Sequence, residues 1–265
     1  MKKTIFITGA STGIGKATAK HFAGKGWHVI ATMRKPENEQ ELNLLENITL
    51  LPLDVTNLQQ IKDTVKETLS LGPVDIVFNN AGYTLLGALE AITDQQLVQQ
   101  METNFFGVVR VTQAFIPYFR ERKAGLFITT TSSAGLAGFP VSSIYDASKW
   151  ALEGWSESLS YELNEFGIGI KNIEPGLVAT DNGASSVIAS HPAYETLLNK
   201  FLAVIGSGTN VTTAEQIAEV VYEAATDGKN TLRYVCGEDA KNLYAHRLAI
   251  GDEAFRDFVR GMVQG

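Results

Sequence analysis

The sequence predicts an α/β fold in which one parallel sheet is covered by helices on both faces. Short runs rich in β-branched and aromatic residues alternate along the chain with segments of helical periodicity. The strand-like runs are apolar throughout, as is typical of parallel strands buried on both faces. A glycine-rich segment, residues 8–15, separates the first strand from the first helix. Right-handed crossovers between such units give a doubly wound sheet.

The individual elements follow from this pattern in chain order. The expected strands are Thr4–Thr8, His28–Met33, Ile48–Pro52, Val74–Asn79, Leu126–Thr131 and Gly169–Glu174. The expected helices carry Ile14, Ala17, Thr18, His21 and Phe22, then Leu58, Ile61, Val65 and Leu69, then about Asn104 to Arg122, then about Ile144–Asn164. The arrangement is that of a Rossmann-like, doubly wound nucleotide-binding fold.

The chain of 265 residues is expected to form a single domain, because α/β folds reach this size undivided and no linker or internal repeat interrupts it. One long irregular stretch is expected at about residues 181–210. Irregular stretches of this length usually act as lids or binding loops, so a substrate lid is expected here, with a passive surface loop as the alternative.

Composition excludes several classes of function. The net charge is −7 and no basic tract occurs, so neither nucleic acid nor an anionic membrane is an expected partner. No run of about 18 apolar residues could span a membrane. A single cysteine, Cys236, and the lack of a signal peptide favour a reducing, cytoplasmic location. The four histidines and Cys236 form no metal-ligand pattern, so no metal is expected.

The glycine-rich segment is the first candidate binding site. Gly9, Gly13 and Gly15 would allow a tight turn and close approach of the backbone to a pyrophosphate, while Ser11 and Ile14 lie at the start of the following helix. Unpaired N–H groups at a helix N-terminus favour a phosphate. Glycines also serve ordinary turns, but the position between strand and helix favours a dinucleotide cofactor.

The end of the second strand bears on the choice of cofactor. NAD-selective sites place an acid about 20 residues after the glycines, to bind the ribose 2′-hydroxyl. Here Arg34 and Lys35 follow the strand, and no acid occurs before Glu37. Arg34 could hold a 2′-phosphate bidentately, so NADP(H) is expected in preference to NAD(H); a solvated basic loop is the alternative.

Two later strand ends could also contact the cofactor. Asp54, followed by Val55, could accept a hydrogen bond from the adenine amino group, although an acid there could equally begin a helix. Asn80, Ala81 and Gly82 combine an amide with small residues, which suits contact with the cofactor ribose.

Tyr145 and Lys149 are the candidate proton-transfer residues. They lie four residues apart near the start of a helix, so both point from the same face. A nearby ammonium favours the phenolate and lowers a tyrosine pKa from about 10. Ser132, thirteen residues before Tyr145, could hold a substrate carbonyl beside the phenol. Ser133 is the competing serine, and a polar strand-to-loop transition is the alternative explanation.

Together these motifs resemble the classical short-chain dehydrogenase/reductase family over about residues 4–180. The motifs that carry the resemblance are Thr8–Gly15, Asn79–Gly82, Asn104, Ser132, Tyr145–Lys149 and Pro175-Gly176. The Ala31–Arg34 strand ending and the long lid are similar to the 17β-hydroxysteroid-dehydrogenase-like subgroup.

The resemblance implies roles for six residues. Asn104 would hold a water in a proton relay, Ser132 would polarise the carbonyl, and Tyr145 would be the general acid or base. Lys149 would bind the nicotinamide ribose and depress the tyrosine pKa. Val178 would contact the carboxamide through its backbone, and Thr180 would lie near the pyrophosphate. The resemblance also implies a homodimer or homotetramer, formed through the two long helices.

The expected function is therefore NADP(H)-dependent hydride transfer between the nicotinamide and a small-molecule carbonyl or alcohol. Apolar residues in the lid, including Leu197, Phe201 and Ile205, favour a lipophilic substrate, although a lid packed on its own core would look the same. Two other functions are weighed. A non-catalytic NADP(H)-binding regulator would need no proton donor, and an epimerase or dehydratase is disfavoured by the glycine spacing.

Overall fold

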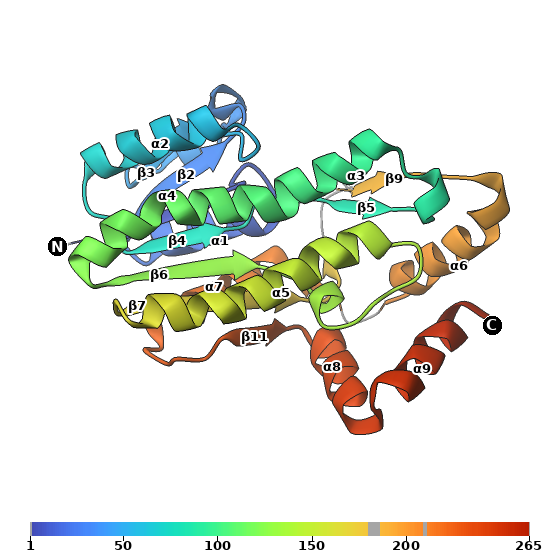
Figure 1. Ribbon diagram of the computed structural model, residues 1–265. Helices are drawn as coiled ribbons and strands as arrows, with labels where there is room; N and C mark the ends of the chain where they lie inside the picture. Colours follow the sequence, from blue (N-terminus) through green and yellow to red (C-terminus); the bar gives the residue numbers. More distant parts are fainter. Residues whose placement is uncertain (1, 180–185, 209–210, 265) are drawn as a thin grey trace.

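A seven-stranded sheet forms the centre of the computed structural model, which describes residues 2–179, 186–208 and 211–264 (Figure 1). In spatial order its strands are β11 (Arg233–Cys236), β7 (Ile168–Pro175), β6 (Gly125–Thr130), β4 (Ile76–Asn79), β1 (Thr4–Thr8), β2 (His28–Met33) and β3 (Ile48–Pro52). All neighbouring pairs are parallel. The predicted doubly wound parallel sheet is confirmed. The strand order reverses between β1 and β4, and ligands bind outside the carboxyl ends of strands at such a point.

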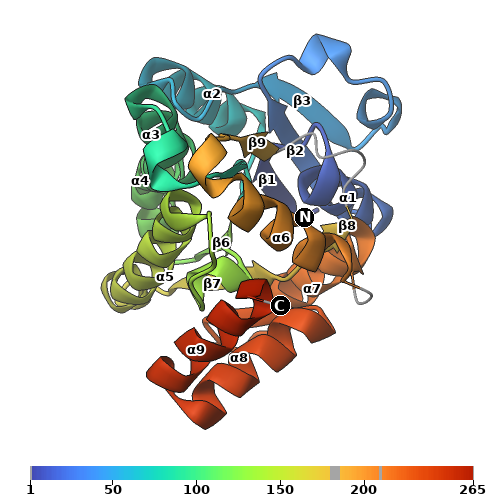
Figure 2. The ribbon, with the colours of Figure 1, turned by 90° about the vertical axis from the view of Figure 1, so that its right-hand side faces the viewer.

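Helices cover both faces of the sheet. Those nearest to it are α1 (Gly13–Gly24), α2 (Leu58–Leu71), α4 (Gly107–Arg122), α5 (Ser143–Asn164) and α7 (Ala214–Thr226). Figure 2 shows α2, α4 and α5 on one side and α1 and α7 on the other. Strand β1 serves both cores: Ile5 and Ile7 belong to one hydrophobic cluster, and Phe6 between them belongs to the other. Side chains on alternate faces of each strand explain why the strand runs are continuously apolar.

The helix expected at about Asn104 to Arg122 is α4, and the helical segments that lead into it begin ten residues before Asn104. Helix α3 (Asp94–Met101) starts after a capping box in which Thr93 and Gln96 bond each other's backbone N–H groups. A π-helical turn, η4 (Glu102–Phe106), then joins α3 to α4. Asn104 therefore lies inside a π-turn, a feature that is frequent at functional sites.

The segment expected to be irregular at residues 181–210 contains regular structure where it is described. Strand β9 (Ser186–Ile188) pairs in parallel with β5 (Thr84–Leu86), and helix α6 (Glu195–Gly206) follows. Residues 181–185 and 209–210 lie outside the described part. The prediction of an irregular stretch is wrong for residues 186–188 and 195–206, because pairing with β5 and packing on a later helix order them.

The C-terminal segments complete the carboxyl edge of the sheet. They are β8 (Val178–Ala179), β10 (Thr212–Thr213), α8 (Glu238–Ile250) and α9 (Asp252–Gln264). Strands β8 and β10 pair in parallel, and α9 packs on both α8 and α6. The arrows of β4, β6 and β11 in Figure 1 point towards α6 and α8, so these helices surround the end of the sheet where a site is expected. Of the helices described, none has the length and apolar character needed to cross a membrane.

Candidate active site

The glycine loop leaves the carboxyl end of β1 with two glycines in the left-handed region, Gly9 at φ +68° and Gly13 at φ +52°. A Cβ on Gly9 would lie 2.7 Å from the Cα of Ala81, and one on Gly15 would overlap the Gly9 carbonyl oxygen. A Cβ on Gly13 would meet no described atom within 4 Å. Gly9 and Gly15 therefore allow close packing of the loop, whereas Gly13 faces open space, as expected where a backbone approaches a phosphate.

The loop ends at helix α1, whose N-terminal residues are exposed. The N-cap residue Thr12 makes no side-chain capping bond to any residue in the described part of the chain. Ser11, Thr12 and Gly13 are exposed, and Ile14 is half-buried. Backbone N–H groups at this helix start are available to an anion, so the residues fit the pyrophosphate of a dinucleotide.

A hydrogen-bond network fastens the end of β4 to the end of β1. The Thr8 hydroxyl accepts bonds from the backbone N–H groups of Asn80 at 2.9 Å and Ala81 at 3.0 Å. The Asn80 amide donates to the carbonyl oxygens of Thr8 at 3.2 Å and Gly9 at 3.1 Å. The structure thus brings three of the predicted cofactor residues, Gly9, Asn80 and Ala81, into contact.

Arg34 follows β2 with an exposed side chain and makes no ion pair with any described residue. The buried acid nearest in sequence, Glu39, is committed elsewhere. Its carboxylate lies 3.1 Å from the Lys16 ammonium and accepts from the backbone N–H groups of Glu41 and Leu42. Backbone and lysine bonds lower the pKa of Glu39 against the opposing effect of burial. The end of β2 therefore exposes the Arg34 guanidinium. The nearest buried acid, Glu39, already has its bonds to Lys16 and to the backbone.

Asp54 and Val55 are both used in local structure. The Asp54 carboxylate accepts from the Thr56 backbone N–H at 2.9 Å and from the Thr56 hydroxyl at 2.7 Å. The cap of α2 is Asn57, which accepts from the Gln60 N–H. The Val55 side chain is buried in the core against Gly107. A cofactor contact at this position would therefore use backbone atoms of Val55 and the remaining acceptor capacity of Asp54.

Helix α5 carries both proton-transfer candidates. The Lys149 ammonium donates to the Thr130 carbonyl oxygen at 2.9 Å and lies 5.8 Å from the centre of the Tyr145 ring. Burial lowers the pKa of Lys149 to about 8, against the opposing charge of Glu153. Burial raises the pKa of Tyr145 above its ordinary value, which differs from the expected depression. The physical reason is that desolvation of the phenol outweighs the stabilising groups around it.

The groups that favour the Tyr145 phenolate are two hydroxyls, those of Ser132 and Thr84, which act on its pKa as hydrogen-bond partners. Ser132 is buried at the end of the loop after β6, and its hydroxyl accepts from the Ala134 N–H at 3.1 Å. This geometry favours Ser132 over the competing Ser133. The sequence predicts that the segment Tyr83–Leu86 borders the substrate carbonyl, but it gives Thr84, on β5, no role of its own beside Tyr145.

Asn104 is 1% exposed and makes three hydrogen bonds to two residues, Tyr83 and Ser148. Its Oδ1 accepts from the Tyr83 N–H at 3.0 Å, while its Nδ2 donates to the Tyr83 carbonyl oxygen at 2.9 Å and to the Ser148 hydroxyl at 3.2 Å. Ser148 in turn donates to the Tyr145 carbonyl oxygen at 2.6 Å. Asn104 is therefore linked to α5 through Ser148. Ser148 was also missed, although its position within Tyr145–Lys149 on the same helix gave a signal.

Val178 lies on β8, where it pairs with Thr212 of β10. The preceding residue, Leu177, donates its N–H to the Asp239 carboxylate at 2.6 Å. The segment expected to contact the carboxamide is thus held on two sides. Thr180 falls outside the described residues.

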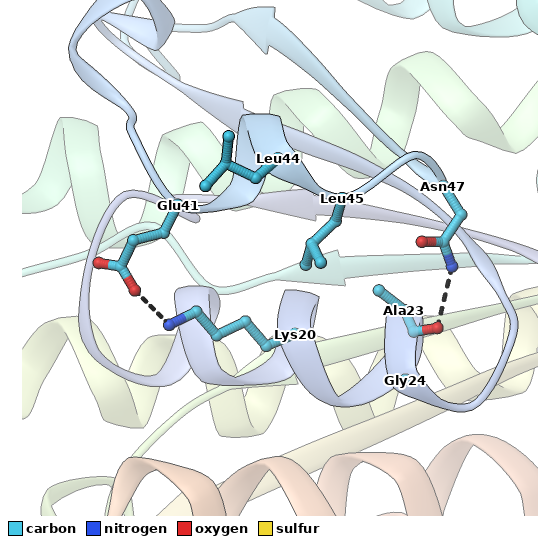
Figure 3. Close-up of a pocket in the computed structure, with 7 residues that line it drawn as sticks. All are labelled: Lys20, Ala23, Gly24, Glu41, Leu44, Leu45 and Asn47. Atoms are coloured by element: carbon cyan, nitrogen blue, oxygen red, sulfur yellow. Dashed lines mark hydrogen bonds and ion pairs between the residues drawn. The ribbon is translucent and has the colours of Figure 1, made fainter.

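A surface cavity of 510 Å³ lies away from these groups (Figure 3). It is formed between α1 and the segment before β3, and its residues include Lys20, Glu41 and Leu45, with Lys20 pointing towards the Glu41 carboxylate. None of the predicted site residues lines it. Among the described residues, no group of three or more His, Cys, Asp and Glu side chains could hold a metal ion.

Comparison with known proteins adds to this picture. The family model for short chain dehydrogenases matches residues 3–190 of this chain. A 3-ketodihydrosphingosine reductase from Bacteroides thetaiotaomicron is 40% identical over 173 residues, which are 65% of this chain and 62% of that protein. A solved short-chain dehydrogenase from Streptomyces avermitilis is 31% identical with a TM-score of 0.88, covering 94% of this chain and 92% of its own. The structure of ElxO with NADP bound is 26% identical with a TM-score of 0.75, covering 89% and 98%.

Proposed function

The chain belongs to the short-chain dehydrogenase family, and we propose that it is an NADP(H)-dependent oxidoreductase acting on a carbonyl or alcohol of a lipophilic small molecule. The observation that carries the proposal is the convergence on Tyr145 of two hydroxyls, from Ser132 and Thr84, and of the Lys149 ammonium from one helical turn away. A phenol with a neutralising cation and a hydroxyl partner is suited to proton transfer at a carbonyl oxygen.

In the direction of reduction, Ser132, Tyr145 and Lys149 have separate roles. The Ser132 hydroxyl donates a hydrogen bond to the substrate carbonyl oxygen and holds it beside the phenol. Tyr145 protonates that oxygen as negative charge develops on it, and the nearby Lys149 ammonium stabilises the resulting phenolate. When bound, the reduced nicotinamide supplies the hydride to the carbonyl carbon. In the opposite direction Tyr145 accepts the alcohol proton.

The residues present fit a dinucleotide. The glycine cradle at Gly9 and Gly13 and the exposed start of α1 would hold the pyrophosphate. Asn80, Ala81 and Gly82 would face the ribose, and Lys149 would bond its hydroxyls. Preference for NADP(H) is supported by the exposed Arg34, by the commitment of Glu39 to Lys16, and by the similarity to ElxO with NADP bound.

A lipophilic substrate is supported by the apolar wall beside this site. Leu86, two residues after Thr84 on β5, is buried in a cluster formed by β5, helix α6 (called the lid helix below) and the last helix, α9. The other members of the cluster are Phe139, Val141, Leu197, Phe201, Leu202, Ile205 and Val263. The similarity to a 3-ketodihydrosphingosine reductase points to the same class of substrate. We propose that residues 186–206 form the lid over this wall.

Consumption of NADPH, followed by its absorbance, tests the proposed function over a panel of aliphatic, aromatic, steroid and long-chain keto compounds. We expect turnover of apolar ketones and a lower apparent affinity for NADH. The matched control is Tyr145→Phe, which keeps the ring and removes only the hydroxyl. It should lose turnover by about 10²-fold or more while binding NADPH as tightly as the parent.

Two results would contradict the proposal. NADPH binding by the parent without turnover of any panel member would indicate a regulator that senses the cofactor. Turnover retained by Tyr145→Phe would show that another group transfers the proton.

A further inference from the structure

The loop between Leu136 and Ser142 is held in place by an acid that the proposed chemistry does not use. Asp146 follows Tyr145 directly on α5, and its Oδ2 accepts a hydrogen bond from the backbone N–H of Phe139 at 2.7 Å. The Ser142 hydroxyl donates to the Phe139 carbonyl oxygen at 3.0 Å. Both backbone polar groups of Phe139 are therefore bonded to the first turn of the helix that carries Tyr145.

Further contacts fasten the two ends of this loop. The Gly87 N–H donates to the Val141 carbonyl oxygen at 2.6 Å, and the Arg247 guanidinium donates to the Leu136 carbonyl oxygen. Val141 has φ +51°, a left-handed conformation that is unfavourable for a β-branched residue. Such strain persists only where the surroundings fix the backbone, and it is concentrated at functional sites.

The clamped loop presents its side chains to the apolar wall. Phe139 packs against two small hydrophobic clusters. One contains Leu86 and Phe201, and the other contains Phe255 and Val259. Its ring centre lies 6.4 Å from that of Phe201 on the lid helix. The backbone position of Phe139 thus determines how its side chain packs between β5, α6 and α9.

Asp146 is poorly suited to a purely stabilising role. The residue is 6% exposed, and its Oδ1 is buried without a hydrogen-bond partner among the described residues. Burial raises the pKa of Asp146 to about 7, against the opposing hydrogen bond from the Phe139 N–H. Buried acids with an unsatisfied oxygen cost stability, so their presence calls for a functional reason.

We propose that Asp146 is a positioning residue that clamps residues 136–142 onto α5, and that it thereby sets which carbonyl substrates fit against Phe139 and Val141. The proposal rests on the proposed function, because it assigns a specificity role within that same site. It predicts that loss of the clamp weakens binding of bulky apolar substrates without removing the proton-transfer groups.

Three variants test this role. Asp146→Ser shortens the side chain so that its hydroxyl oxygen no longer reaches the Phe139 N–H, whereas Asp146→Asn keeps a carbonyl oxygen at the same position and removes only the charge. Glu162→Ser is the matched control, because Glu162 is an exposed acid on the same helix, outside the loop contacts. We measure kcat and KM for the best long-chain ketone of the panel and for a short aliphatic aldehyde.

Asp146→Ser is expected to raise the KM of the long-chain ketone about tenfold, with kcat and the KM of the short aldehyde changed less than threefold. Asp146→Asn should stay within about threefold of the parent for every constant. An unchanged KM in Asp146→Ser, or equal damage in Asp146→Asn, would overturn the specificity role.

Hydrogen–deuterium exchange of the peptide spanning residues 136–142 tests the clamp independently of catalysis. Exchange should accelerate at least tenfold in Asp146→Ser and remain at the parent level in Asp146→Asn and Glu162→Ser. Unchanged exchange in Asp146→Ser would refute the clamp even if the parent turned over no carbonyl compound, and the absence of turnover alone would refute only the proposed function.

If Asp146→Ser does not fold, Phe139→Ala provides the second test. It removes the side chain that the clamp positions and leaves the clamp itself intact. The KM of the long-chain ketone should again rise about tenfold with little change for the short aldehyde, and an unchanged ratio of the two would overturn the proposal.

Discussion

The Lys149 ammonium donates a hydrogen bond to the carbonyl oxygen of Thr130 at 2.9 Å. This bond ties α5 to the carboxyl end of β6, and it fixes the cation one helical turn from Tyr145. Lys149 is 6% exposed, and this burial disfavours the charged form of its ammonium and lowers the pKa of Lys149 to about 8.

The first prediction concerns the pH profile of carbonyl reduction. Above about pH 8 Lys149 loses its charge and no longer stabilises the Tyr145 phenolate, so kcat/KM, which reports the free enzyme, should fall there. Lys149→Arg keeps a charge at every accessible pH. Its activity should be about 100-fold lower at pH 7, because a guanidinium does not reproduce the ammonium geometry, but it should lack the fall near pH 8. A fall at the same pH in both proteins would contradict the assignment.

The second prediction concerns Asn104. Asn104→Ala would leave the Tyr83 N–H and carbonyl groups without their side-chain partner in a buried site, which should lower the free energy of unfolding by about 2–3 kcal/mol. It should also lower kcat, because Ser148 and the first turn of α5 lose a support. Gln99→Ala, which removes an exposed bond to Thr103, is the control and should stay within about 0.5 kcal/mol. Equal urea midpoints for the two variants would show that Asn104 is not a structural link.

Six of the seven strands of the sheet could be predicted from the sequence, whereas β11 and the order of residues 186–206 could not. Strands β1, β2 and β3 have the predicted bounds, because glycines, prolines and polar turns limit short apolar runs. Helix α6 was not predicted, although Leu197, Phe201 and Ile205 recur at helical spacing. Strand β9, which precedes α6, pairs with β5 about 100 residues earlier in the chain. Local periodicity does not predict such a long-range pairing.

The candidate site shows the same division. Spacing on one helix correctly predicts that Tyr145 and Lys149 lie close together, since that depends only on helical geometry. It does not predict that burial raises the Tyr145 pKa, because desolvation depends on elements distant in sequence. The contact between Asp146 and Phe139 likewise could not be predicted from the sequence, since no motif connects a helix residue with the backbone of the loop before it.

The third prediction concerns cofactor choice. Arg34→Asp replaces an exposed cation at the end of β2 by an acid that would accept a bond from a ribose 2′-hydroxyl and repel a 2′-phosphate. The ratio of kcat/KM for NADPH to that for NADH should fall by about 100-fold or more. Lys20→Asp, on the outer side of α1, is a charge-matched control and should leave the ratio unchanged. An unaltered ratio in Arg34→Asp would remove the basis for preferring NADP(H).

The fourth prediction concerns the packing of the glycine loop. A Cβ at residue 15 would overlap the Gly9 carbonyl oxygen and lie 2.6 Å from the Asn80 amide nitrogen. Gly15→Ala should therefore lower the free energy of unfolding by about 1–3 kcal/mol and weaken NADPH binding. At Gly24, in the same helix, a Cβ would meet no described atom within 4 Å, so Gly24→Ala should stabilise by about 0.5–1 kcal/mol. Denaturant unfolding and cofactor titration distinguish the two, and equal behaviour would show that the loop relaxes freely.

The last prediction concerns a partly buried cluster, in which three acids from α5 and β7 surround the Arg233 guanidinium. The Arg233 guanidinium nitrogen Nε lies 2.9 Å from the carboxylate of Glu153 and 3.7 Å from that of Glu174, while Glu157 binds another nitrogen of the same group. Glu174 is fully buried, and neither of its carboxylate oxygens has a hydrogen-bond partner among the described residues. Burial and the neighbouring charge of Glu153 raise the pKa of Glu174 well above its ordinary value.

An acid whose pKa is higher in the folded than in the unfolded protein contributes stability below its unfolded pKa. That contribution is lost as the pH rises through the folded value. Glu174→Gln removes the titration, so its free energy of unfolding relative to the parent should be near zero at pH 5. By pH 9 the variant should be more stable by about 1 kcal/mol or more. Glu157→Gln, at the exposed end of the cluster, should give a small difference that does not change with pH. Urea unfolding at pH 5, 7 and 9 measures both variants; a difference for Glu174→Gln that stays constant across this range would mean that Glu174 is ionised in the folded protein.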